Sequence, residues 1–88
     1  MRKESEFKNR DRFIELGITI AYSRKLRGMT QEQLAERVGI SRSHLSLIEA
    51  PNHVQAFSLD ILYSISDALN ISPSDLLNAT CALPKLVK

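Results

Sequence analysis

Residues 30–49 read TQEQLAERVGISRSHLSLIE, and this stretch predicts two short helices. Thr30 and Gln33 have the spacing of a capping box, in which each side chain accepts a hydrogen bond from the backbone amide of the other residue. Gly39 is typical of the residue that follows a helix, and Ser41 is typical of an N-cap. Because only Gly39-Ile40-Ser41 separates the two helices, we expect them to cross at a steep angle.

The rest of the chain carries further helix signals. We predict a first helix from Asp11 to Arg27, with Gly28 as its left-handed stop. A fourth helix is capped by Ser58 and ended by Asn70, and Ser72-Pro73-Ser74-Asp75 opens a short fifth helix. Strand signals are missing, since there is no period-2 alternation and no Asn-Gly or Asp-Gly hairpin. The predicted fold class is all-α, a compact domain of five helices.

Apolar residues recur at helical spacing and predict one buried core. We expect residues 13–77 to form the domain, preceded at 1–12 by a charged arm or helix extension and followed at 78–88 by a tail. The expected inward-facing residues are Phe13, Leu16, Ile20, Ser23, Leu34, Ala35, Val38, Leu45, Ile48, Phe57, Leu59, Leu62, Ile65, Ala68, Leu69, Leu76 and Leu77.

Length and composition limit the function classes. The chain has 88 residues, 43% hydrophobic and 25% charged, which fits one small globular domain and excludes a multidomain enzyme. It has no apolar run of the roughly 18 residues that a membrane span needs and no secretory signal. Cys81 is the single cysteine, so we expect no internal disulfide. These features predict a soluble, cytoplasmic protein.

The charges are unevenly distributed although the net charge is only +2. Residues 1–50 hold ten Lys or Arg against seven Asp or Glu, whereas residues 51–84 hold three Asp and no Lys or Arg. A basic first half is compatible with a polyanionic partner and equally with an ordinary solvated surface. Charge alone therefore does not choose between these two interpretations.

The helix predicted after Ser41 has one face suited to DNA bases. Two short helices joined by a Gly-led turn are typical of a helix-turn-helix, whose second helix enters the major groove. At about 100° per residue, its outer arc consists of Arg42, Ser43, Ser46, Leu47 and Ala50, whereas Leu45, Ile48 and Glu49 face inward and His44 lies at the border. An arginine reads guanine, short hydroxyls allow close approach, and an aliphatic side chain meets the thymine methyl. Each of these residues is also an ordinary surface residue when taken alone.

The stretch from Arg24 to Glu49 resembles the lambda-repressor-like, Cro-type (XRE) helix-turn-helix family. Together with residues 58–77, which resemble the family's fourth and fifth helices, the resemblance covers residues 13–77. It implies a five-helix DNA-binding domain that regulates transcription. It further implies a homodimer that reads a palindromic operator in double-stranded DNA, with repression as the default by analogy.

The resemblance also assigns roles to individual residues. Arg42, Ser43, Ser46 and Leu47 fall on the base-reading positions. Gln31 matches a glutamine that binds a DNA phosphate and braces the first reading side chain, and Arg24 and Glu49 match a structural salt bridge. We expect further phosphate contacts at the start of the second helix of the helix-turn-helix and in the loop that follows this helix. That loop is longer than in many relatives. The candidates are Ser41, His44, Asn52 and His53.

The main alternative to a DNA-binding regulator is a protein-interaction module of the same fold, either an antitoxin or an antagonist of another regulator. An enzyme is not expected, because His44 and His53 lack partners at metal-ligand spacing and no nucleophile has a positioned base. We therefore expect no metal, no cofactor and no small-molecule effector. The fifth helix and the apolar tail at residues 82–87 are the sequence's candidates for a dimer interface.

Overall fold

The computed structural model describes residues 9–78 of the chain. These residues contain four helices and one further helical segment, joined by turns and a loop. The helices are α2 (Arg10–Leu26), α3 (Gln31–Val38), α4 (Arg42–Glu49) and α5 (Leu59–Leu69), and residues 73–78 are also helical. No strand occurs within these residues, so the predicted all-α fold is confirmed. The apolar tail proposed as an interface lies outside the described residues, and so does Cys81.

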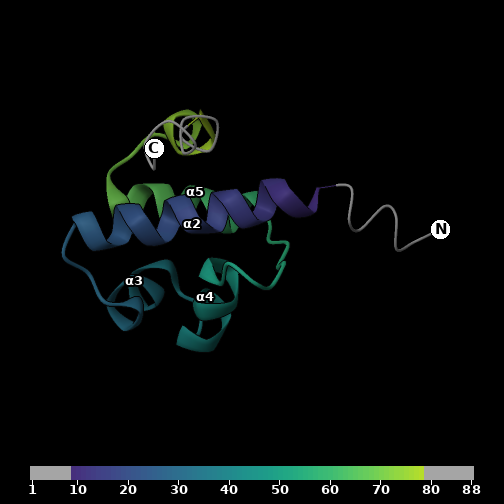
Figure 1. Ribbon diagram of the computed structural model, residues 1–88. Coiled ribbons are helices and arrows are strands. Elements are labelled where there is room, and N and C mark those ends of the chain that lie inside the picture. The colour runs from purple at the N-terminus through teal and green to yellow at the C-terminus, as the bar shows by residue number, and fades with distance from the viewer. Residues whose placement is uncertain (1–8, 79–88) are drawn as a thin grey trace.

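The longest helix, α2, links the two halves of the fold. In Figure 1, α3 and α4 lie on one side of α2, α5 runs alongside it, and residues 73–78 lie on the other side. Of the helix pairs in contact, α2 with α4 and α3 with α5 share the most contacts. The helix-turn-helix pair is thus held by two longer helices that themselves pack together.

Local hydrogen bonds determine where α2 ends and α3 begins. The φ angle of Gly28 is +74°, and the amides of Gly28 and Met29 donate to the carbonyls of Lys25 and Arg24 at 3.0 and 3.1 Å. This is the Schellman arrangement, which satisfies carbonyls that a helix end otherwise leaves unpaired. Thr30 and Gln33 then form the predicted capping box, with distances of 3.0 and 2.9 Å.

We expect Thr30→Ala to lower the free energy of unfolding by about 1 kcal/mol, because the amide of Gln33 loses its acceptor at the start of α3. Urea denaturation followed by circular dichroism measures the change. Thr30→Ser is the matched control, since serine keeps the hydroxyl and is expected to stay close to the unmodified protein. Equal losses in both variants would contradict the capping role.

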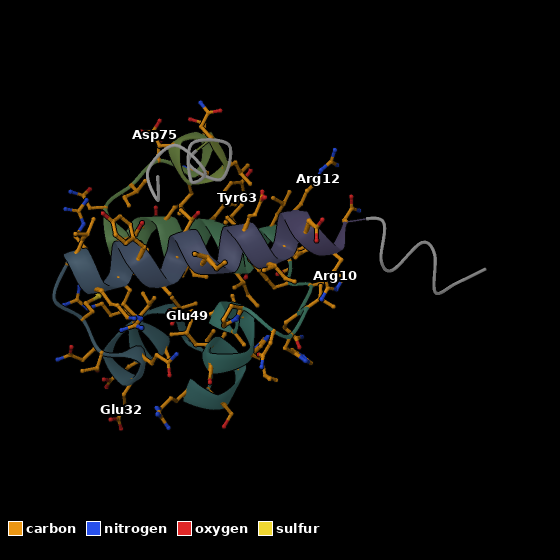
Figure 2. All side chains as sticks on the ribbon, viewed as in Figure 1. Arg10, Arg12, Glu32, Glu49, Tyr63 and Asp75 are labelled. Atoms are coloured by element: carbon orange, nitrogen blue, oxygen red, sulfur yellow. The ribbon has the colours of Figure 1, made fainter. Side chains whose placement is uncertain are left out.

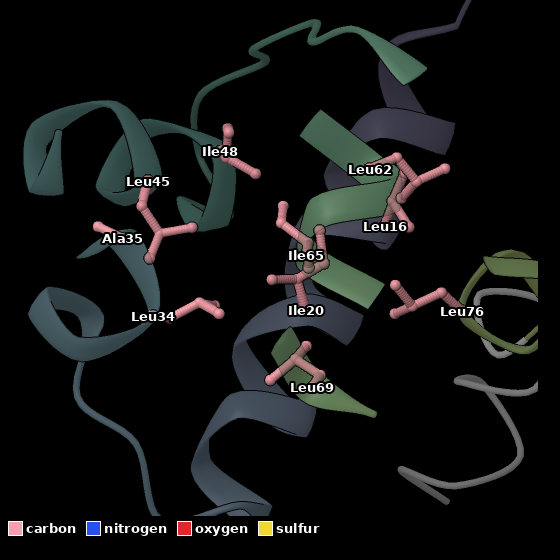
Figure 3. Close-up of a cluster of buried hydrophobic side chains, with 10 residues drawn as sticks. All are labelled: Leu16, Ile20, Leu34, Ala35, Leu45, Ile48, Leu62, Ile65, Leu69 and Leu76. Atoms are coloured by element: carbon pink, nitrogen blue, oxygen red, sulfur yellow. The ribbon is translucent and has the colours of Figure 1, made fainter. Parts of the chain in front are cut away.

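The core lies where α2, α3, α4 and α5 meet (Figure 3). Its buried side chains are Leu16, Ile20, Leu34, Ala35, Leu45, Ile48, Leu62, Ile65, Leu69 and Leu76. All ten were expected to face inward, whereas two other expected members, Leu59 and Leu77, are 63% and 48% exposed. Leu59 is the first residue of α5, at the edge of the core rather than inside it. Leu77 is about 100° around the helix from Leu76, so only Leu76 reaches the core.

Side-chain contacts fasten the longer connections to α2. The rings of Phe57 and Phe13 meet edge to face, with centroids 5.6 Å apart, which holds the loop between α4 and α5 against the start of α2. At the other end of α2, Arg27 Nε donates to the carbonyl of Leu69 at 2.8 Å. Because that carbonyl belongs to the last turn of α5, the cation also favours the negative end of this helix.

Candidate nucleic-acid interface

The side chains on the outer arc of α4 make no hydrogen bond or ion pair within residues 9–78. Arg42, Ser43, Ser46 and Leu47 are all exposed, and Leu47 retains 42% of its accessible surface. Within residues 9–78, no hydrogen bond or ion pair engages the guanidinium of Arg42. The structure therefore brings the four candidate base readers together on one surface and leaves their polar groups available to a partner.

The inner face of α4 anchors this surface to the core. Leu45 is fully buried and Ile48 is 2% exposed, in agreement with the inward positions expected from the sequence. Ser41 caps the helix by accepting the amide of His44 at 3.0 Å. Buried apolar anchors on one side and a cap at the start give α4 a defined orientation, which a reading helix requires.

A buried ion pair holds the end of α4 against α2. Arg24 Nε and Nη2 donate to the two carboxylate oxygens of Glu49 at 2.9 and 3.0 Å. The two residues are only 7% and 5% exposed, and Glu49 lies between α2 and α4 (Figure 2). Arg24 Nη1 also donates to the carbonyl of Met29 at 2.7 Å. One arginine thus ties together α2, α4 and the turn that leads into α3.

Gln31 belongs to the same network. Its Nε2 donates to Glu49 Oε1 at 2.9 Å, so the side chain is oriented by the ion pair and makes no hydrogen bond to Arg42 in this structure. Gln31 and Arg42 nevertheless line one open cleft of about 680 Å³, beside the first turn of α3. The carboxylate of Glu49 consequently has three donors in reach, and each of its oxygens is satisfied.

The remaining candidate phosphate ligands lie at the start of α4 and in the loop after it, in different environments. Ser41 is exposed while its oxygen caps α4, and His44 is half-buried. Asn52 and His53 are exposed in the loop after α4. No hydrogen bond within residues 9–78 engages the side chains of Asn52 or His53.

Two structural features of this site were missed by the sequence reasoning. A Cβ atom on Gly17 would collide with the carbonyl oxygen of Ile48, so α2 and α4 approach each other with no space for a side chain. A glycine inside an otherwise regular helical pattern is a signal for such an approach. The contact from Arg24 to the carbonyl of Met29 has no sequence signal, because it depends on how the turn folds back.

Residues 9–78 contain no group of three or more His, Cys, Asp or Glu side chains arranged to hold a metal ion. None of the helices described there is long and apolar enough to cross a membrane.

Comparison with known proteins adds one match. A family model described as helix-turn-helix matches residues 20–76, which run from the middle of α2 through α3, α4 and α5 to the helical segment at 73–78. The matched stretch is more than half of the chain and contains every residue of the outer arc of α4. A search of curated proteins found no match.

Proposed function

Since the chain belongs to the Cro-type helix-turn-helix family of DNA-binding regulators, we propose that it represses transcription by reading a palindromic operator as a homodimer. The observation that carries this proposal is the outer arc of α4. Arg42, Ser43, Ser46 and Leu47 on this arc are exposed and make no side-chain hydrogen bond, while the opposite face of the same helix is anchored in the core.

In the proposed complex, α4 lies in the major groove. Arg42, in the first turn, grips O6 and N7 of a guanine with its guanidinium. Ser43 and Ser46 are small enough for the helix to approach the base edges, and Leu47 contacts a thymine methyl group. Because the guanidinium of Arg42 has no hydrogen-bond partner within residues 9–78, it breaks no such bond when it binds DNA.

The start of α3 supplies the contact to the DNA backbone. The first amides of a helix have no partners within the helix and attract a phosphate through the helix dipole. Gln31 lies at this position, and its Nε2 has a second hydrogen that is not used by Glu49. We assign Gln31 the role of a phosphate ligand whose side chain Glu49 holds in place. Ser41, His44 and Asn52 add weaker contacts to the DNA backbone.

Two copies of the domain read two half-sites. In a two-fold symmetric complex, the two α4 helices enter successive major grooves about 34 Å apart, so the operator has the symmetry of the protein. A dimer bound across a promoter excludes other proteins from the same DNA, which is the physical basis for assigning repression.

Selection of bound sequences from a random duplex pool at about 0.15 M salt tests this proposal. The unmodified protein is expected to enrich a two-fold symmetric consensus. We expect Arg42→Ala to lose preference at one base pair in each half-site and to bind the consensus half-site about 5- to 150-fold more weakly, the equivalent of about 1–3 kcal/mol.

Arg37→Ala is the matched control for this experiment. Arg37 is also an exposed arginine, but it lies in the last turn of α3, away from Gln31. Its loss removes the same charge and should leave the consensus unchanged. No enrichment by the unmodified protein would contradict sequence-specific DNA binding and would favour a protein-interaction module instead. Equal effects of the two variants would contradict the role of Arg42.

A further inference from the structure

The outer face of α2 carries an apolar stripe that the DNA-binding proposal does not use. Ile18, Tyr22 and Leu26 follow one another at intervals of four residues and are 38%, 53% and 69% exposed. Residues spaced in this way lie along one side of a helix. The buried residues Leu16, Ile20 and Ser23 lie on the side of α2 opposite Ile18, so apolar side chains occur on this helix both toward the core and toward solvent.

Two exposed charged residues near the line of this stripe have opposite signs and lie at opposite ends of α2. Asp11 lies in the first turn of α2 and Lys25 in the last turn, and both side chains are exposed. On the helical wheel, both fall within about 20° of Ile18, which is midway between them in the sequence. The only described ion pair on this face is a solvent-exposed contact of 3.4 Å between Asp11 and its neighbour Arg10.

We propose that a second copy of this chain packs on this stripe, with the two α2 helices antiparallel and Ile18 at the two-fold axis. In that arrangement Asp11 of each copy faces Lys25 of the other, while Ile18 meets its own symmetry mate. A parallel arrangement would instead place like charges together. The order of charges thus selects the antiparallel pair, and an interface of this kind is self-complementary, as a two-fold axis requires.

The exposed apolar residues on the other side of the fold do not have this property. Leu59 of α5 lines a pocket with Leu77 of the helical segment at 73–78, and both are exposed, as is Tyr63 of α5. Residues 51–78 hold three Asp and no Lys or Arg, so this segment offers no pair of opposite charges that could match across a two-fold axis. The described residues therefore favour α2 as the surface where two copies meet.

The α2 interface rests on the homodimer of the proposed function and says where its two copies meet. Sedimentation velocity without DNA tests this interface. At about 0.05 M salt, where surface charges are weakly screened, Asp11→Lys and Lys25→Asp are each expected to raise the dimer dissociation constant about threefold to tenfold. The double variant Asp11→Lys/Lys25→Asp restores both pairs with their signs exchanged, so its dissociation constant should return to the original value. Ile18→Ser is expected to raise it more than tenfold.

Leu59→Ser is the control, because it removes an apolar side chain from α5 that is even more exposed, at 63% against 38% for Ile18. It should leave the dimer intact. If Leu59→Ser dissociates the dimer and Ile18→Ser does not, the α2 interface is wrong. The homodimer and the proposed reading of DNA would still stand. A monomer at every concentration, with and without operator DNA, would remove the homodimer itself. Failure of the double variant to restore association would refute the antiparallel pairing.

Discussion

Arg24→Ala is expected to lower the free energy of unfolding by about 3–5 kcal/mol, because it leaves the buried carboxylate of Glu49 without its cation. Glu49 would retain a single neutral donor, Gln31, and the carbonyl of Met29 would lose its partner as well. A domain of 88 residues has a stability of about 4–13 kcal/mol, so this loss removes much of the total. Urea denaturation measures this loss, provided that the unfolding free energies of the two proteins depend on urea concentration with the same slope.

Two controls separate loss of the ion pair from loss of packing. Arg37→Ala removes an exposed arginine and should change the stability by less than about 0.5 kcal/mol. The double variant Arg24→Met/Glu49→Leu replaces both buried charges with apolar side chains and should be more stable than Arg24→Ala, since no uncompensated charge remains. If Arg24→Ala unfolds at the same urea concentration as the unmodified protein, the ion pair does not hold α4 on α2.

Helix ends were predictable because the interactions that form them are local. Ser58 accepts the amide of Ile61 at 3.2 Å, and Ser41 caps α4 in the same way. Asn70 has a φ of 58° and ends α5 in the left-handed conformation expected of it. Each of these contacts joins residues a few positions apart, so their types and spacing contain the information.

Features that depend on contacts between distant parts of the chain were not predictable from the sequence. Leu59 continues the apolar spacing of α5, but its side chain at the start of that helix is 63% exposed. The hydrogen bond from Gln31 to Glu49 was not expected from the sequence, because the two residues are 18 positions apart. The exposed stripe on α2 was missed for the same reason, since periodicity identifies apolar faces without showing which of them is covered.

Replacing Gly17 with alanine is expected to destabilise the domain by about 3 kcal/mol, although alanine favours a helix interior by about 1 kcal/mol over glycine. The added Cβ would meet the carbonyl oxygen of Ile48, and backbone atoms cannot move aside as a flexible side chain does. The helices α2 and α4 would have to separate, which also stretches the pair between Arg24 and Glu49. Helix propensity and close packing therefore predict opposite signs, and thermal or urea denaturation decides between them.

Gly28→Ala isolates the close approach from the general cost of replacing a glycine. Gly28 has a positive φ, and a Cβ there would meet no atom within 4 Å, so its substitution costs only about 1–2 kcal/mol of backbone strain. At a temperature where both variants remain folded, Gly28→Ala should bind operator DNA normally. Gly17→Ala should bind it more weakly, because the displaced α4 carries Arg42 and Leu47 away from the bases. Normal DNA binding by Gly17→Ala together with unchanged stability would show that α2 and α4 are not in close contact at this point.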